Sequence, residues 1–157
     1  MAERARELLS EKLPLDSTLA RAISADKREC REAVGVLRMM QRSGRVEAGI
    51  YLMGLLAAAP DDWECRTAIV EALHGFDIEG CARLLFGELL AVKGSNTTRR
   101  YRDAVLKTLA ALPAESTRAG FMAMLEDPTC SQRAREKVRC ILDGNDLRCE
   151  RTVFGDQ

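Results

Sequence analysis

The sequence of 157 residues predicts an all-α protein, an α-solenoid of about four stacked antiparallel helical hairpins. Apolar residues recur at helical spacing through most of the chain, and β-branched runs are few. A short phrase also returns, as "CREAV" at 30–34, "CRTAI" at 65–69, "YRDAV" at 101–105 and "AREKV" at 134–138. The steps of 33 to 36 residues between copies are too long for a helix period and too short for separate domains. The phrase therefore marks a repeated helical hairpin.

Helix-capping residues set the expected order of elements. Four segments are preceded by a side chain able to accept hydrogen bonds from the first N–H groups of a helix: Asp26, Asp62, Asp77 and Asn96. Four segments are followed by a glycine, where a C-terminal cap requires positive φ: Gly44, Gly75, Gly94 and Gly144. The predicted helices are 3–13, 15–24, 26–42, 45–59, 62–74, 78–92, 97–112, 114–126 and 131–143.

Two helix types alternate along the chain. The phrase described above marks the second helix of each hairpin, and a different family marks the first: "AGIYLMGLLA" at 48–57, "ARLLFGELLA" at 82–91 and "RAGFMAMLED" at 118–127. A hairpin has an apolar face that it cannot bury alone, so neighbouring hairpins stack. We expect one domain over residues 1–157, with N-terminal capping helices in 1–25, repeats in 26–143 and an irregular tail in 144–157.

An arginine recurs at the same place in every copy of the phrase. The four residues are Arg31, Arg66, Arg102 and Arg135. Each could reach back to the turn before its helix and bond to aspartate or to loop carbonyls there. The alternative is an exposed charge on a solvated helix face. Recurrence in all four copies favours the structural role.

The segment "APDDWECRTAIVEALHGF" at 59–76 resembles the second-helix signature of HEAT-like repeats of the phycobilisome-lyase type. The matching residues are Asp61, Asp62, Arg66, Ala68, Ile69, Ala72 and Leu73, with Gly75 one residue later than usual. The segment at 125–144 is similar with an insertion, whereas "GSNTTRRY" in the third copy lacks the aspartate turn. The resemblance covers about residues 26–143 and implies a right-handed HEAT-like solenoid. Relatives of this type include bilin lyases, their chaperone-like subunits and DNA glycosylases.

Composition excludes several classes of function. Hydrophobic residues make up 46% of the chain and charged residues 31%, while basic and acidic residues number 24 each. A balanced charge gives no general attraction to nucleic acid or to anionic lipid, although it leaves room for a local basic patch. The longest apolar stretch, at 48–60, is too short to span a bilayer, and the first 13 residues do not resemble a signal peptide. We therefore expect a cytoplasmic protein with no membrane contact.

The cysteines and the single histidine do not form a metal or catalytic motif. Six cysteines are present, at 30, 65, 81, 130, 140 and 149, without any C-x-x-C pair. We expect Cys30, Cys65 and Cys81 to be buried free thiols, because free cysteine packs like a small hydrophobe; a redox or metal role is the alternative. His74 stands at a helix end, where a cation is favoured, and a lone general base is the alternative. The prediction is therefore no metal and no cofactor.

One basic cluster, "TTRRYR" at 97–102, combines three arginines with Tyr101 at the start of a helix. Aromatic and arginine side chains together can bind nucleic acid, and a helix N-terminus can bind an anion. The alternative is a solvated helix start. The neutral charge of the whole chain disfavours the nucleic-acid interpretation.

The most plausible function is protein binding through the second helix of each hairpin, without enzymatic activity. Helical phase predicts an inward face of Ala33, Val34, Leu37, Cys65, Ala68, Ile69, Ala104, Val105, Leu109, Val138, Ile141 and Leu142. Glu32, Met39, Thr67 and Glu136 then point outward, with the candidate partner-binding residues Val70, Glu71, His74, Asp103, Leu106, Lys107 and Arg139. Mixed charge with scattered aliphatic residues suits a polypeptide partner. The family resemblance leaves open an enzyme accessory of the bilin-lyase or chaperone-like kind, or a nucleic-acid-binding protein.

Overall fold

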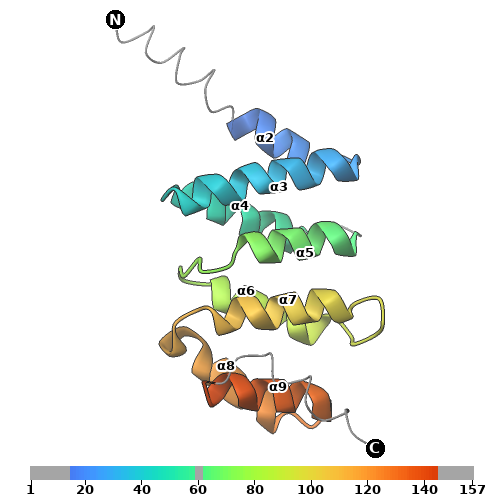
Figure 1. The fold of residues 1–157 in the computed structure, drawn as a ribbon, viewed down its shortest axis with the longest axis vertical. Helices are drawn as coiled ribbons and strands as arrows, with labels where there is room; N and C mark the ends of the chain where they lie inside the picture. Colours follow the sequence, from blue (N-terminus) through green and yellow to red (C-terminus); the bar gives the residue numbers. More distant parts are fainter. Residues whose placement is uncertain (1–14, 59–61, 145–157) are drawn as a thin grey trace, which may run out of the picture. The chain divides into compact units, whose positions relative to one another are not determined.

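The computed structural model describes residues 15–58 and 62–144 (Figure 1). Within these ranges it contains eight α-helices and no strand, which confirms the all-α prediction. The predicted helix 3–13 and residues 145–157 of the predicted tail lie outside the described ranges.

The chain divides into two compact units, with the boundary between Leu73 and His74. The first unit contains α2 (Leu15–Ala22), α3 (Lys27–Arg42), α4 (Val46–Ala57) and α5 (Trp63–Ala72), and α3 packs on the other three. The second contains α6 (Cys81–Ala91), α7 (Arg99–Ala110), α8 (Ala114–Glu126) and α9 (Gln132–Leu142). In this unit α6 packs on α7, α8 packs on α9, and α6 also contacts α8. Each helix overlaps the range predicted for it.

The first-unit caps agree with the sequence pattern. Asp26 precedes α3, and its carboxylate accepts hydrogen bonds from the N–H groups of Arg28 (2.8 Å) and Glu29 (3.4 Å). Asp62 stands at the N-cap of α5 without bonding to the helix, and its carboxylate instead lies 3.6 Å from Lys27 Nζ. The left-handed backbone predicted after the helices is found at Gly44 (φ 90°) and, at the boundary with the second unit, at Gly75 (φ 77°).

Two second-unit caps were predicted wrongly. Helix α6 begins later than expected, after Gly80 in the left-handed region (φ 88°), and Asp77 instead accepts a hydrogen bond from the Ser116 hydroxyl. Helix α7 begins after Thr98 rather than Asn96. Gly94 lacks positive φ because the chain does not reverse at that residue but continues as a loop to Thr98.

The inward face predicted for the second helices is largely buried, but it is wider than a single stripe. Ala33, Val34 and Leu37 on α3 are buried, as are Ala104, Val105 and Leu109 on α7. Thr67, Val70 and Leu106, predicted to point outward, are also buried. Helix α5 contacts both α3 and α4, so it buries more than one stripe. Leu106 also lines a cleft that is described below.

Two of the four recurring arginines behave as predicted. Arg102 reaches back from α7 to the end of α6, where its Nη1 donates hydrogen bonds to the carbonyls of Leu89 (2.8 Å) and Val92. Arg135 makes the equivalent contact from α9, with Nη2 2.7 Å from the Asp127 carbonyl at the end of α8. These bonds satisfy carbonyl groups that a helix end leaves without partners.

The first two arginines are placed differently. The Arg66 guanidinium lies over the Trp63 ring, 4.9 Å from its centroid, in the geometry of a cation–π contact. Arg31 is exposed, bonds to the Lys27 carbonyl of its own helix and pairs with Glu64 at 3.5 Å. The prediction that every copy ties a turn through its arginine is therefore wrong at Arg31.

Candidate functional site: a cationic cleft in the second unit

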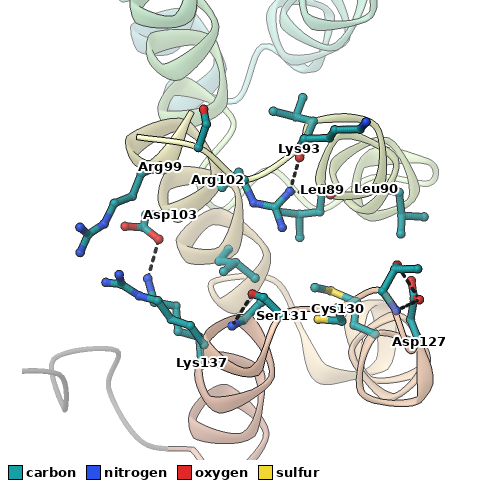
Figure 2. Close-up of a pocket in the computed structure, with 18 of the residues that line it drawn as sticks. Leu89, Leu90, Lys93, Arg99, Arg102, Asp103, Asp127, Cys130, Ser131 and Lys137 are labelled. Carbon is teal, nitrogen blue, oxygen red and sulfur yellow. Dashed lines mark hydrogen bonds and ion pairs between the residues drawn. The ribbon is translucent and has the colours of Figure 1, made fainter. Parts of the chain in front are cut away.

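A cleft of about 770 Å³ opens in the second unit where α6 and α8 end and α7 and α9 begin (Figure 2). Its floor is apolar and is formed by Leu89, Leu106 and Met124, all of them buried. Leu90 lies at the rim and is 70% exposed. The two loops that join the helices of each hairpin, 92–98 and 127–131, border the opening. Its volume lies in the range of small-ligand pockets.

Short polar side chains fix the first of these loops. The Thr98 hydroxyl donates to the Lys93 carbonyl at 2.7 Å and accepts from the Ser95 N–H at 2.9 Å. Serine and threonine commonly bond to nearby backbone in this way, and the result is a compact turn. Arg102 holds the same loop to the end of α6 through the carbonyls already described. Lys93 is therefore carried on an ordered backbone.

The second loop is held by an aspartate turn. The Asp127 carboxylate accepts hydrogen bonds from the Thr129 hydroxyl (2.7 Å) and N–H (2.8 Å). These two bonds, with a smaller contribution from the charge of Arg135, lower the pKa of Asp127 below its usual range. Ser131 then caps α9 by accepting from the Ala134 N–H at 3.3 Å. The carboxylate of Asp127 is thus engaged within its own loop.

Positive charge predominates along the cleft. Among the described residues, two carboxylates line it, Asp103 and Asp127, against five basic side chains: Lys93, Arg99, Arg102, Arg133 and Lys137. The surplus is three positive charges on a chain whose formal net charge is zero. Asp103 is already paired with Lys137 at 2.6 Å (Figure 2). Of the basic side chains that line the cleft, Lys93 and Arg99 are exposed and would meet an incoming anion.

Helices α7 and α9, which begin at the cleft, differ from most of the other described helices in the charge of their first turn. Helices α3, α4, α5 and α8 each have a glutamate in the first turn, where a carboxylate complements the helix dipole. Helices α7 and α9 have no acid there and carry Arg99 and Arg133 instead. A cation in the first turn opposes the dipole and costs stability. The positive ends of both helices and their arginines together favour an anionic ligand.

The structure divides the seven candidate residues from the sequence between the two units. Val70 and Glu71 belong to the first unit, and the other five belong to the second. Asp103 and Leu106 line the cleft. Val70 is fully buried. The remaining four are exposed: Glu71, His74, Lys107 and Arg139. One continuous surface along the second helices stays a prediction.

Sequence reasoning missed three basic residues of the cleft: Lys93, Arg133 and Lys137. The repeat interval could have indicated two of them. Arg133 follows Arg99 by 34 residues, and Lys137 follows Asp103 by the same step. Equivalent positions of adjacent hairpins lie near each other in stacked repeats, so the spacing of Asp103 and Lys137 was a usable signal for an ion pair.

The cluster "TTRRYR" does not offer an aromatic surface. Tyr101 is only 1% exposed, and its hydroxyl donates a hydrogen bond to the Glu88 carboxylate. A ring in that position cannot stack on a base. Arg102 is committed to backbone carbonyls, so within the cluster only Arg99 presents a charge to the cleft. The arrangement suits an anion better than a nucleic-acid base.

The cysteines depart from the expectation in one respect. Cys30, Cys65 and Cys81 are all buried, as predicted. Cys30 and Cys65, expected to be free thiols, are joined in a disulfide between α3 and α5. The expectation was wrong because helices α3 and α5 are in contact, which brings Cys30 and Cys65 together across 35 residues of sequence. Cys81 is free, as are Cys130 and Cys140.

Within residues 15–58 and 62–144, no group of three or more His, Cys, Asp or Glu side chains is placed to hold a metal ion. In the same ranges no helix combines the length and apolar character needed to cross a membrane. Comparison of the chain with protein-family models, with curated proteins and with solved structures finds no match. The resemblance to HEAT-like repeats therefore stays a prediction.

Proposed function

We propose that this chain is a HEAT-like helical-repeat module that binds a protein partner, and that the cleft in its second unit takes an acidic segment of that partner. The observation that carries the proposal is the surplus of basic side chains around an apolar floor. Repeat proteins of stacked hairpins commonly bind along the surface that several repeats share. Asp103 and Leu106, which sequence reasoning placed on the binding face, are part of this cleft.

The lining fits a polypeptide with both carboxylates and an apolar side chain. Leu89 and Leu106 provide an apolar floor, and Leu90 adds an exposed apolar group at the rim. Lys93 and Arg99 are exposed on opposite borders, one on the loop after α6 and one at the start of α7. An apolar anchor with charged groups around it is the usual anatomy of a peptide-binding surface.

A nucleic-acid partner fits less well. Binding of single strands uses aromatic side chains for base stacking, and Tyr101 in the basic cluster is buried. A phosphate backbone also calls for a basic surface that extends over many charges, whereas the cleft has a surplus of three. An oligonucleotide is therefore the appropriate competing ligand in the test.

Binding can be measured by fluorescence anisotropy with a labelled peptide of glutamate and leucine. A matched peptide carries glutamine in place of every glutamate. We expect the acidic peptide to bind, with an affinity that falls as salt rises, and the glutamine peptide to bind far more weakly. Arg99→Glu and Lys93→Glu should each weaken binding about three- to tenfold.

The control variant is Arg83→Glu, which reverses an exposed charge on α6 outside the cleft. It should bind the acidic peptide like the unmodified chain, and all variants should keep the helical circular-dichroism spectrum. Equal binding of the two peptides would contradict the proposal. So would equal loss in Arg83→Glu and Arg99→Glu, or tighter binding of a single-stranded oligonucleotide than of the acidic peptide.

A further inference from the structure

The disulfide of the first unit lies beside a pocket of its own. Cys30 is in the first turns of α3 and Cys65 in the first turn of α5, with 35 residues between them in sequence. Each residue is at most 5% exposed. Both nevertheless line a pocket of about 370 Å³, bordered by residues 22–25 at the end of α2. Protein therefore encloses the disulfide on most sides. On the remaining side the disulfide faces a space large enough for a small molecule.

Of the described residues, one cation and one carboxylate line the pocket. Lys27 is in the first turn of α3 with its side chain 66% exposed, and its Nζ lies 3.6 Å from Asp62 Oδ1. The other carboxylate oxygen, Asp62 Oδ2, is buried and has no hydrogen-bond partner among the described residues. A buried carboxylate oxygen without a donor is costly. A ligand with an ammonium group would satisfy it, and a carboxylate on the same ligand would meet Lys27.

The two sulfurs also lie near the N-termini of their helices. A helix N-terminus presents N–H groups and the positive end of the dipole, which favour a negatively charged sulfur. Cys30 and Cys65 both occupy such positions, on different helices. A sulfur of this kind is a good leaving group when an external thiol attacks a disulfide.

We propose that the Cys30–Cys65 disulfide is a reversible clasp, opened through this pocket by a small thiol that carries an ammonium and a carboxylate group, as amino-acid thiols do. The inference concerns the first unit only and is independent of the cleft. The clasp joins α3 to α5, so its opening loosens the contact between the second helices of two successive repeats.

The exchange balances with two molecules of the external thiol. The thiolate of the first attacks one sulfur and forms a mixed disulfide, while the Cys30–Cys65 bond breaks and the released sulfur takes a proton. The second molecule attacks the mixed disulfide, forms the oxidised external disulfide and frees the remaining protein thiol. Two electrons thus pass to the protein, one disulfide of the small thiol is formed, and the reverse reaction closes the clasp.

The test uses the full chain with Cys130, Cys140 and Cys149 replaced by serine, which leaves Cys81 as an internal reference. The native protein is treated with reduced glutathione or with 2-mercaptoethanol, which lacks both charged groups. Free thiols are then trapped by alkylation and counted by intact mass. In each state we take the ratio of the rate of opening with glutathione to the rate with 2-mercaptoethanol. We expect this ratio to be higher for the native protein than for the protein unfolded in urea. A clasp that opens only in urea, or an equal ratio in both states, would overturn the proposal.

Two neighbouring cations provide a matched pair of variants. Lys27→Ala removes the cation that lines the pocket, whereas Arg28→Ala removes the next residue of the same helix turn, outside the pocket. The glutathione reaction should slow several-fold in Lys27→Ala alone, with the 2-mercaptoethanol reaction unchanged in both variants. Equal rates in the two variants would contradict the assigned role of the pocket. Cys30→Ser, which cannot close the clasp, should form a mixed disulfide at Cys65 when it is treated with oxidised glutathione, with one molecule of reduced glutathione released. Absence of this mixed disulfide in the folded protein would also count against the proposal.

Discussion

At the scale of single residues, burial depends on helical phase and on how many neighbours a helix has. Leu109 and Lys107 are two positions apart on α7, and one is fully buried while the other is exposed. The apolar pattern was enough to predict this difference. It was not enough at Val70, which is fully buried although the pattern placed it outward. A single stripe describes a helix with one packing partner, and α5 has two, α3 and α4.

Truncation of these side chains tests the phase directly. Leu109→Ala should lower the free energy of unfolding by about 2–5 kcal/mol, and Val70→Ala by about 1–3 kcal/mol, since each removes buried methyl groups and leaves a cavity. Lys107→Ala should change it by less than about 0.5 kcal/mol, as exposed substitutions usually do. Urea denaturation followed by circular dichroism gives all three values. A Val70→Ala protein as stable as the unmodified chain would show that this side chain is not packed as described.

Cys81 makes stability depend on pH in the alkaline range. Burial, together with the nearby charge of Asp77, raises the pKa of its thiol from 9.0 to about 11. Because the pKa of this thiol is lower in the unfolded chain, rising pH ionises the thiol of the unfolded chain before that of the folded chain. The contribution of the neutral thiol to the free energy of unfolding is therefore complete below pH 9 and is lost between pH 9 and about 11. By about pH 10.5 the loss should be about 2 kcal/mol.

The matching variant is Cys81→Ala, which has no thiol to ionise. The unmodified chain should exceed it in stability at neutral pH, and the difference should shrink by the stated amount at alkaline pH. Urea denaturation of both proteins at the two pH values measures this. A difference that does not change with pH would contradict the raised pKa.

At the scale of helices, the start and end of each element were mostly readable from capping residues, and the exceptions have local causes. Asp26 caps α3 as predicted. At α6 the left-handed Gly80 replaces the expected Asp77. An aspartate is a cap only where the chain enters the helix directly after it, and residues 77–80 form a longer connection. The arginine contacts at Arg102 and Arg135 were predictable because the same turn geometry recurs.

The contact of α6 with α8 depends on the absence of a side chain at Gly120. A methyl group there would overlap the Phe86 ring, with even the Cδ2 atom only 2.7 Å away. Phe86 in turn packs edge-on against Phe121, with ring centroids 5.1 Å apart. Gly120→Ala should therefore destabilise the chain by about 1–2 kcal/mol, because overpacking outweighs the better helix propensity of alanine.

Gly87 on α6 is the matched control, since a methyl group there meets nothing within 4 Å. Gly87→Ala should stabilise the chain by about 0.5–1 kcal/mol. Thermal or urea denaturation should thus move in opposite directions for the two glycines. Combining Gly120→Ala with Phe86→Leu should recover part of the loss. Stabilisation by Gly120→Ala alone would show that α6 and α8 do not approach closely.

At the scale of the whole molecule, sequence composition concealed the candidate site. Equal numbers of acidic and basic residues exclude a general basic field but give no position for a local patch, and the described lining of one cleft has a surplus of three positive charges. The charges come from the first turns of α7 and α9 and from the two loops that precede them, so only their position in space brings them together. The Cys30–Cys65 pairing is similar, because the packing of α3 on α5 brings residues 35 positions apart into contact.

An exchange of charge between protein and peptide tests the central claim, that the cleft binds an acidic polypeptide segment. The double variant Lys93→Glu/Arg99→Glu reverses two exposed cations of the cleft. Anisotropy is measured for the glutamate–leucine peptide and for its counterpart with lysine in place of glutamate. We predict that the unmodified chain prefers the glutamate peptide and that the double variant prefers the lysine peptide, with both preferences fading as salt rises. A double variant that keeps the preference of the unmodified chain would contradict the claim.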